Sequence, residues 1–119
     1  MAKKILVVDD EPDLLKVVTF RLKKIGYDII EATDGQKAIA LIQEHRPDLI
    51  LLDLRLPVID GWEVCRRVKS DDQLKHIPIV LLTASAHNLE MTKELKAEDF
   101  LVKPFEPEEL LAIIKKYIG

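Results

Sequence analysis

Four positions in this sequence carry polar side chains directly after a run of aliphatic residues. They are the pair Asp9–Asp10, then Asp53, Thr83 and Lys103. Three carboxylates that converge without a cation would repel one another and raise one another's pKa values. Mg²⁺ relieves that repulsion, because it prefers carboxylate, water and phosphate oxygens, while a lysine binds phosphoryl oxygens as a mobile positive charge. The set therefore predicts a site for a phosphoryl group and Mg²⁺, rather than for a sugar or a peptide.

Each of these residues also has an ordinary structural explanation. The pair Asp9–Asp10 can cap the helix that follows it, Thr83 can be a β-branched residue at the end of a strand, and Lys103 can be a solvated surface lysine. Because the pattern recurs at the ends of four predicted strands, the sequence favours a functional site over four separate coincidences.

The segment Leu49–Asp53 is the best indication of the elements that position these residues. Its four consecutive aliphatic residues are typical of a strand buried on both faces in a parallel sheet, and Pro57 prevents the strand from continuing.

Five strands alternate with five helices along the chain. We predict strands at 3–8, 27–32, 49–53, 77–82 and 100–102, and helices at 12–25, 34–44, 60–68, 91–96 and 107–118. This alternation predicts an α/β domain with helices on both faces of a parallel sheet, whose carboxyl ends share one edge.

The composition is that of a soluble globular domain. The 119 residues are 48% hydrophobic and 33% charged, which suffices for one domain with a core. The net charge of −3 lacks the Lys and Arg excess of a domain that binds nucleic acid or a membrane surface. No apolar run is long enough to cross a bilayer, and we do not expect the N-terminal residues to act as a signal peptide. The single cysteine, Cys65, cannot form an internal disulfide, so we expect the protein to be located in the cytoplasm. We expect Cys65 itself to be a small helix residue rather than a reactive thiol.

Five short motifs follow one another along the chain. They are Val7–Asp10 (VVDD), Leu51–Pro57 (LLDLRLP), Asp60–Gly61 (DG), Leu82–Ala84 (LTA) and Val102–Phe105 (VKPF). Together they resemble the receiver domain of bacterial two-component response regulators, of the chemotaxis-regulator type. The resemblance covers essentially the whole chain. It implies one receiver domain over residues 1–119, with a flavodoxin-like, doubly wound fold and the strand order 2-1-3-4-5.

The resemblance implies a role for each acidic residue. Asp53 would accept a phosphoryl group from a phosphohistidine on a sensor histidine kinase or a histidine phosphotransfer protein. Asp10 and Asp53 would bind Mg²⁺ directly and Asp9 through water, and the third protein ligand would be the main-chain carbonyl of Arg55. The domain would be a regulator rather than an enzyme, catalysing only its own phosphorylation and dephosphorylation.

The resemblance also implies a conformational switch. Thr83 would move toward the new phosphoryl group and donate a hydrogen bond to it, and Lys103 would pair with it. The Lys–Pro peptide is usually cis in this family, so Pro104 is a candidate cis proline. Phe100 stands where the family has a switching aromatic residue, commonly Tyr, although it can equally be core of an edge strand. The switch would signal to a downstream protein or output domain that the sequence does not identify.

Two features depart from the family pattern. The segment between Thr83 and Lys103 is shorter than usual, so the αL-compatible glycine that ends the fourth helix is absent and Lys96 stands near its place. We therefore expect a short or irregular fourth helix. Arg55 and Ser85 occupy positions that flank the path of the hydrolytic water in the family, and the long cation at Arg55 predicts an altered phosphoryl lifetime.

The first predicted helix carries an apolar stripe that we expect to face the sheet, made of Leu14, Val17, Val18, Leu22 and Ile25. Leu15 and Phe20 fall outside this stripe, one on each flank. Apolar residues beside the buried stripe of a helix are about as often exposed without any function as they are part of a docking site. We assign Leu15 and Phe20 to docking, because the first helix commonly contacts the phosphodonor's helical bundle in the family.

Two other functions remain open. One is a receiver-like protein-binding module that signals without phosphorylation, which the unusual fourth-helix segment permits. The other is a Mg²⁺-dependent phosphatase with an aspartyl nucleophile. Such enzymes usually place a second Asp two residues after the nucleophile, where Arg55 stands here.

Overall fold

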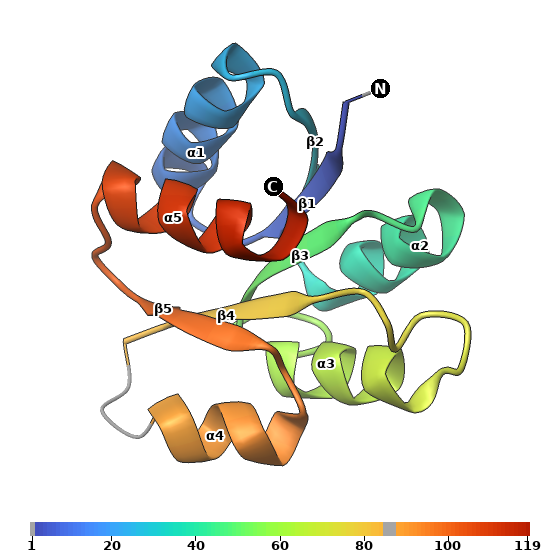
Figure 1. Cartoon of the computed structure of the whole chain (residues 1–119). Coiled ribbons are helices and arrows are strands. Elements are labelled where there is room, and N and C mark those ends of the chain that lie inside the picture. The colour runs from blue at the N-terminus through green and yellow to red at the C-terminus, as the bar shows by residue number, and fades with distance from the viewer. Residues whose placement is uncertain (1, 85–87) are drawn as a thin grey trace.

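The computed structural model describes residues 2–84 and 88–119, and within them the centre is a parallel sheet in the order β2-β1-β3-β4-β5 (Figure 1). This order confirms the one that the resemblance implies. The strands are β1 (Lys4–Val8), β2 (Asp28–Ala32), β3 (Leu49–Asp53), β4 (Ile79–Thr83) and β5 (Asp99–Val102).

The three inner strands are the uninterrupted aliphatic runs of the sequence. All five residues of both β3 and β4 are buried, whereas the edge strand β2 begins with an exposed residue. Both faces of an inner strand are covered in a parallel sheet, so these runs need no polar alternation. The register pairs Val8 with Leu52 and Asp53 with Leu82, so the ends of neighbouring strands lie at one edge.

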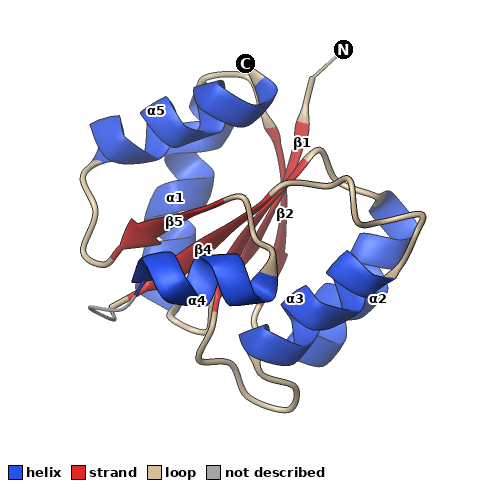
Figure 2. Cartoon of the chain, turned by 60° about the horizontal axis from the view of Figure 1, so that its bottom comes forward, coloured by secondary structure: helices blue, strands red, loops and turns tan. Residues whose placement is uncertain are grey.

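Helices cover both faces of the sheet (Figure 2). Their bounds are α1 (Pro12–Lys24), α2 (Gly35–His45), α3 (Gly61–Ser70), α4 (Asn88–Leu95) and α5 (Pro107–Ile118). The buried side chains of α1 and α5 form one core with one face of the sheet, and those of α2, α3 and α4 form a second core with the other face. Among residues 2–84 and 88–119, none of the helices combines the length and the hydropathy that a membrane span requires.

The helices begin where local signals predict. Pro12 and Pro107 occupy the first turns of α1 and α5, while the side chains of Asp34 and Asp60 accept hydrogen bonds from backbone N–H groups in α2 and α3. The predicted end of α3 at residue 68 was wrong, because residues 69 and 70 also belong to the helix.

The predicted buried face of α1 requires correction. Leu15, Val18 and Leu22 are buried, whereas the exposed fractions of Val17, Phe20 and Ile25 are 55%, 64% and 52%. Apolar residues cover so much of this helix that two stripes are possible, and periodicity alone cannot choose between them. The sheet and α5 decide the choice, and they bury Leu15.

The fourth helix is short, as predicted, with only 8 residues. Lys96 follows it with a φ of 60°, in the left-handed region where glycine is usual. The predicted role of Ser85 lies outside the described residues. Cys65 is buried in α3, and burial raises its pKa to about 11, which agrees with a structural thiol.

Candidate functional site

The functional residues predicted from the sequence lie at one edge of the sheet. Asp53 and Thr83 end β3 and β4, while Asp9 and Lys103 directly follow β1 and β5. The backbone N–H of Lys103 donates to the carbonyl of Thr83 at 2.8 Å, which joins the ends of β4 and β5. A cleft opens here, lined by Asp10, Glu11, Asp53, Leu54, Arg55, Trp62, Leu82, Thr83, Ala84, Met91 and Lys103.

Lys103 is surrounded by carboxylates. Its Nζ lies 2.6 Å from Asp9 Oδ2, 3.1 Å from Glu11 Oε1 and 3.3 Å from Asp53 Oδ2. Burial opposes the charge of this lysine, but Asp9, Glu11 and Asp53 outweigh that effect and hold the pKa of Lys103 above its ordinary value. Lys103 therefore remains an ammonium group beside the Asp53 carboxylate.

Asp9 has no exposed surface. Its Oδ1 accepts a hydrogen bond from the backbone N–H of Glu11 at 3.0 Å. Burial raises the pKa of Asp9 and the charge of Asp53 adds to the effect, although the contacts with Lys103 and the Glu11 N–H oppose it. A buried carboxylate of this kind needs a nearby cation, and Lys103 supplies one.

The Asp53 carboxylate is held at both oxygens. Oδ1 accepts the backbone N–H of Arg55 at 3.0 Å, and Oδ2 faces Lys103 at 3.3 Å. Only 9% of the side chain is exposed. The carboxylate is therefore fixed in orientation at the floor of the cleft, which suits a group that must meet an incoming phosphorus atom in line.

The acidic residues fit a divalent cation. One carboxylate oxygen from each of Asp9, Asp10 and Asp53 lies within 4.8 Å of the other two. An all-oxygen donor set of high negative charge suits Mg²⁺. These residues would hold the ion, and the assignment of the Arg55 carbonyl as a further ligand remains a prediction.

Two residues near the site were missed by the sequence analysis. Gly61 has no room for a side chain, because a Cβ atom there would lie 2.3 Å from the Asp53 carbonyl oxygen and 2.6 Å from Leu54 Cα. In the sequence, Gly61 stood out only as part of the Asp60–Gly61 motif of the family resemblance. The sequence assigned no role to Glu11, because no local pattern shows that its side chain reaches Lys103.

The predicted switch residues, Thr83 and Phe100, lie on the neighbouring strands β4 and β5. Thr83 is buried and lines it. Phe100 is half-buried, pairs with Leu81 across β4 and β5, and packs against the core on the α4 side of the sheet. The Lys103–Pro104 peptide bond is cis, as predicted.

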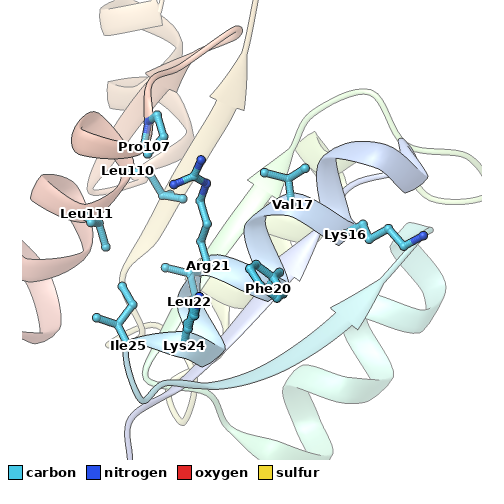
Figure 3. Close-up of a pocket in the computed structure, with 10 residues that line it drawn as sticks. All are labelled: Lys16, Val17, Phe20, Arg21, Leu22, Lys24, Ile25, Pro107, Leu110 and Leu111. Carbon is cyan, nitrogen blue, oxygen red and sulfur yellow. The ribbon is translucent and has the colours of Figure 1, made fainter.

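A second surface feature is an apolar groove between α1 and α5 (Figure 3). Leu15 is buried, with an exposed fraction of 5%, so the prediction that Leu15 docks a partner was wrong. Phe20 lies in the groove and is 64% exposed. The groove is lined by Lys16, Val17, Phe20, Arg21, Leu22, Lys24 and Ile25 from α1 and by Pro107, Leu110 and Leu111 from α5.

Comparisons with known proteins agree with this geometry. Residues 5–115 match the family model of the response regulator receiver domain. The chemotaxis response regulator CheY4 of Vibrio cholerae is 34% identical with a TM-score of 0.92, and the match covers 99% of this chain and 100% of that one. A putative response regulator from Chloroflexus aurantiacus is 33% identical with a TM-score of 0.92 and 98% of each chain covered.

The receiver domain of the sensor histidine kinase PA1611 from Pseudomonas aeruginosa is also similar. It is 33% identical, with a TM-score of 0.90 over 100% of this chain and 99% of that one, and its structure has a magnesium ion coordinated in the active site cleft. The chain therefore belongs to the response regulator receiver domains, the regulatory domains of two-component systems whose general function is that of a phosphorylation switch.

Proposed function

We propose that residues 1–119 form one receiver domain that accepts a phosphoryl group on Asp53 and changes conformation in response. The observation that supports this most directly is the convergence of Lys103 and the acidic residues on the Asp53 carboxylate. These groups come from three different strand ends, and the lysine lies 3.3 Å from the acceptor oxygen. Neither a purely structural carboxylate nor a simple binding surface requires that arrangement.

In the proposed reaction an Asp53 carboxylate oxygen attacks the phosphorus of a phosphohistidine on the donor protein. The new O–P bond forms as the N–P bond breaks, and the imidazole nitrogen keeps the electron pair and takes a proton from water. Asp10 and Asp53 would hold Mg²⁺ directly, with Asp9 acting through water and the Arg55 carbonyl as a further ligand. Bound Mg²⁺ supplies charge neutralisation for the transferring phosphoryl group.

After transfer, Lys103 pairs with a phosphoryl oxygen and the Thr83 hydroxyl donates a hydrogen bond to another. This contact draws Thr83 toward Asp53, and Phe100 moves inward on β5. The phosphoryl group thus shifts the population between two conformations. A downstream protein or output domain would respond to the altered surface around α4, β5 and α5.

The proposed phosphodonor is a sensor histidine kinase or a histidine phosphotransfer protein that docks on α1. Phe20, with Val17 beside it, offers exposed apolar surface, and Lys16, Arg21 and Lys24 surround it with positive charge. Phe20→Ser should slow phosphotransfer from the donor protein and leave labelling by acetyl phosphate unchanged, because the small donor does not use this surface. Equal slowing with both donors would contradict the assignment.

The decisive experiment is incubation with acetyl phosphate and Mg²⁺ followed by mass spectrometry. A single phosphoryl adduct that is absent in Asp53→Asn and in EDTA supports the proposed switch. Continuous turnover of acetyl phosphate without an adduct would instead indicate a phosphatase, and neither adduct nor turnover would indicate a binding module. Trp62 lines the cleft, so its fluorescence should change when Mg²⁺ binds and would provide an independent measurement.

A further inference from the structure

Glu11 makes a contact that the proposed chemistry does not require. Its Oε1 lies 3.1 Å from Lys103 Nζ, at the mouth of the cleft that holds Asp53. Lys103 already has an ion-pair partner in Asp9, at the shorter distance of 2.6 Å. The Glu11 carboxylate is thus an additional partner for a lysine that must later contact the phosphoryl group.

The partners of Lys103 differ in freedom of movement. The side chains of Asp9 and Asp53 are 0% and 9% exposed, whereas that of Glu11 is 60% exposed. A buried carboxylate cannot leave its cation without a large desolvation penalty, but an exposed one can exchange its ion pair for water at little cost. Glu11 is therefore the partner that can leave.

The backbone does not hold the Glu11 side chain either. Glu11 is the N-cap residue of α1, yet its side chain makes no capping hydrogen bond. An N-cap carboxylate that turned toward the helix would accept a hydrogen bond from the first-turn N–H groups. Here the carboxylate is directed to Lys103 instead.

We propose that Glu11 is a positioning residue that competes with the phosphoryl group for Lys103 and so slows phosphorylation of Asp53. Before transfer, Glu11 occupies the lysine and adds negative charge where a phosphoryl dianion must approach. During transfer it turns out to solvent, and Lys103 becomes available to the phosphoryl oxygens. This inference rests on the proposed function, because it concerns the same acceptor.

Two substitutions separate the contact from the charge. Glu11→Gln removes the charge. Glu11→Asp keeps the charge but is one methylene shorter, and Asp at an N-cap turns toward the first-turn N–H groups. That variant should be at least as stable as the wild type, so loss of structure cannot explain its effect. Asp13→Asn is the matched control, since it removes an exposed carboxylate from the first turn of the same helix.

The test measures adduct formation with acetyl phosphate at saturating Mg²⁺ and low ionic strength. In this step the Asp53 oxygen bonds to phosphorus, and acetate leaves with the electron pair of the broken P–O bond. Both Glu11 variants should react about two- to fivefold faster than the wild type, the range expected for loss of an exposed ion pair. Asp13→Asn should react at the wild-type rate.

A second measurement needs neither Mg²⁺ nor phosphate. The ¹⁵Nζ resonance of Lys103, identified by its loss in Lys103→Arg, should shift in both Glu11 variants and stay in place in Asp13→Asn. Wild-type rates in Glu11→Asp would show that only net charge matters and would overturn the proposal, as would unchanged or slower labelling of Glu11→Gln. Absence of any Asp53 adduct in the wild type would instead overturn the proposed function, and the Lys103 resonance would still report the contact.

Discussion

The ammonium group of Lys103 lies 2.6 Å from Oδ2 of the buried Asp9, closer than it lies to the proposed acceptor. Lys103 therefore stabilises the unphosphorylated domain, because it neutralises a carboxylate that has no exposed surface. A buried ion pair that loses one partner leaves an uncompensated charge, which is strongly destabilising. The same lysine thus couples the stability of the domain to its proposed chemistry.

Lys103→Met should lower the free energy of unfolding by about 3 kcal/mol in EDTA, because Asp9 then keeps its charge without a cation. Mg²⁺ should restore part of this loss, since a divalent ion beside Asp9 replaces the missing positive charge. Urea unfolding with and without Mg²⁺ measures both effects. Lys116→Met is the control, as its ion pair with Asp99 is exposed, and it should cost less than about 1 kcal/mol. If Mg²⁺ raised the free energy of unfolding of both variants by the same amount, this explanation would be contradicted.

A second prediction concerns Lys69, which lies in the last turn of α3, just beyond the helix end predicted from the sequence. Only 6% of its side chain is exposed, and Nζ contacts the carbonyl oxygens of Lys75 and Ile77 and Oε2 of Glu98. Glu98 also accepts the backbone N–H of Ile79 at 2.7 Å. The network therefore joins the end of α3 to the segments that lead into β4 and β5.

Lys69→Met should destabilise the domain by about 3 kcal/mol, because it leaves these acceptors without their donor. Lys75→Met provides the comparison, since Lys75 pairs with Asp72 on the surface, and it should change the free energy of unfolding by less than about 1 kcal/mol. Chemical denaturation of both variants checks the difference. Equal stabilities would show that the Lys69 network contributes no more than a surface ion pair.

The contacts of Tyr117 predict that the stability of the domain depends on pH in the alkaline range. Its hydroxyl oxygen lies 2.8 Å from Asp99 Oδ2 and 2.9 Å from the Glu98 carbonyl oxygen. Burial and the neighbouring Asp99 carboxylate raise the pKa of Tyr117 to about 12 from its ordinary value of 10.0. The folded state thus favours the protonated hydroxyl, so this contribution to stability is complete below pH 10 and is lost as the pH rises toward 12.

The corresponding measurement compares the wild type with Tyr117→Phe. The wild type should be more stable by about 1.5 kcal/mol at pH 8, as expected for a hydrogen bond to a charged acceptor. The difference should shrink above pH 10, when the wild-type hydroxyl begins to ionise. Asp99, whose pKa the Tyr117 hydroxyl helps to lower, is ionised throughout this alkaline range, so the subtraction isolates the ionisation of Tyr117. A difference that stayed constant to pH 12 would rule out this role.

Gly61→Ala should displace Asp53, the proposed phosphoryl acceptor. The added methyl group would overlap the Asp53 carbonyl and Leu54 Cα, and relief of such overpacking typically costs about 1–3 kcal/mol. The shift of the strand end should also slow labelling of Asp53 by acetyl phosphate. Gly26→Ala is a useful comparison, because a Cβ there meets no atom within 4 Å although its φ is +106°. It should lose stability through backbone strain and keep its labelling rate.

Much of this molecule follows from local sequence. The short aliphatic runs of β1, β3 and β4, which end at polar residues, favour buried strands, and their alternation with helices favours a parallel sheet. In such a sheet the residues after each strand share one edge. The proximity of Asp9, Asp53 and Lys103 was therefore predictable without coordinates, and the resemblance to receiver domains added the strand order.

Other features depend on contacts between segments distant in the chain. Periodicity allowed two apolar stripes on α1, and packing against the sheet and α5 buried Leu15 and exposed Val17 and Phe20. Likewise, the ion pair between Glu11 and Lys103 joins residues 92 positions apart. Local patterns record which side chains tend to be buried, but they contain no information about which distant side chain stands opposite. The sequence by itself therefore determined the elements and the edge at which they converge, whereas only the tertiary structure decided which neighbours each side chain meets there.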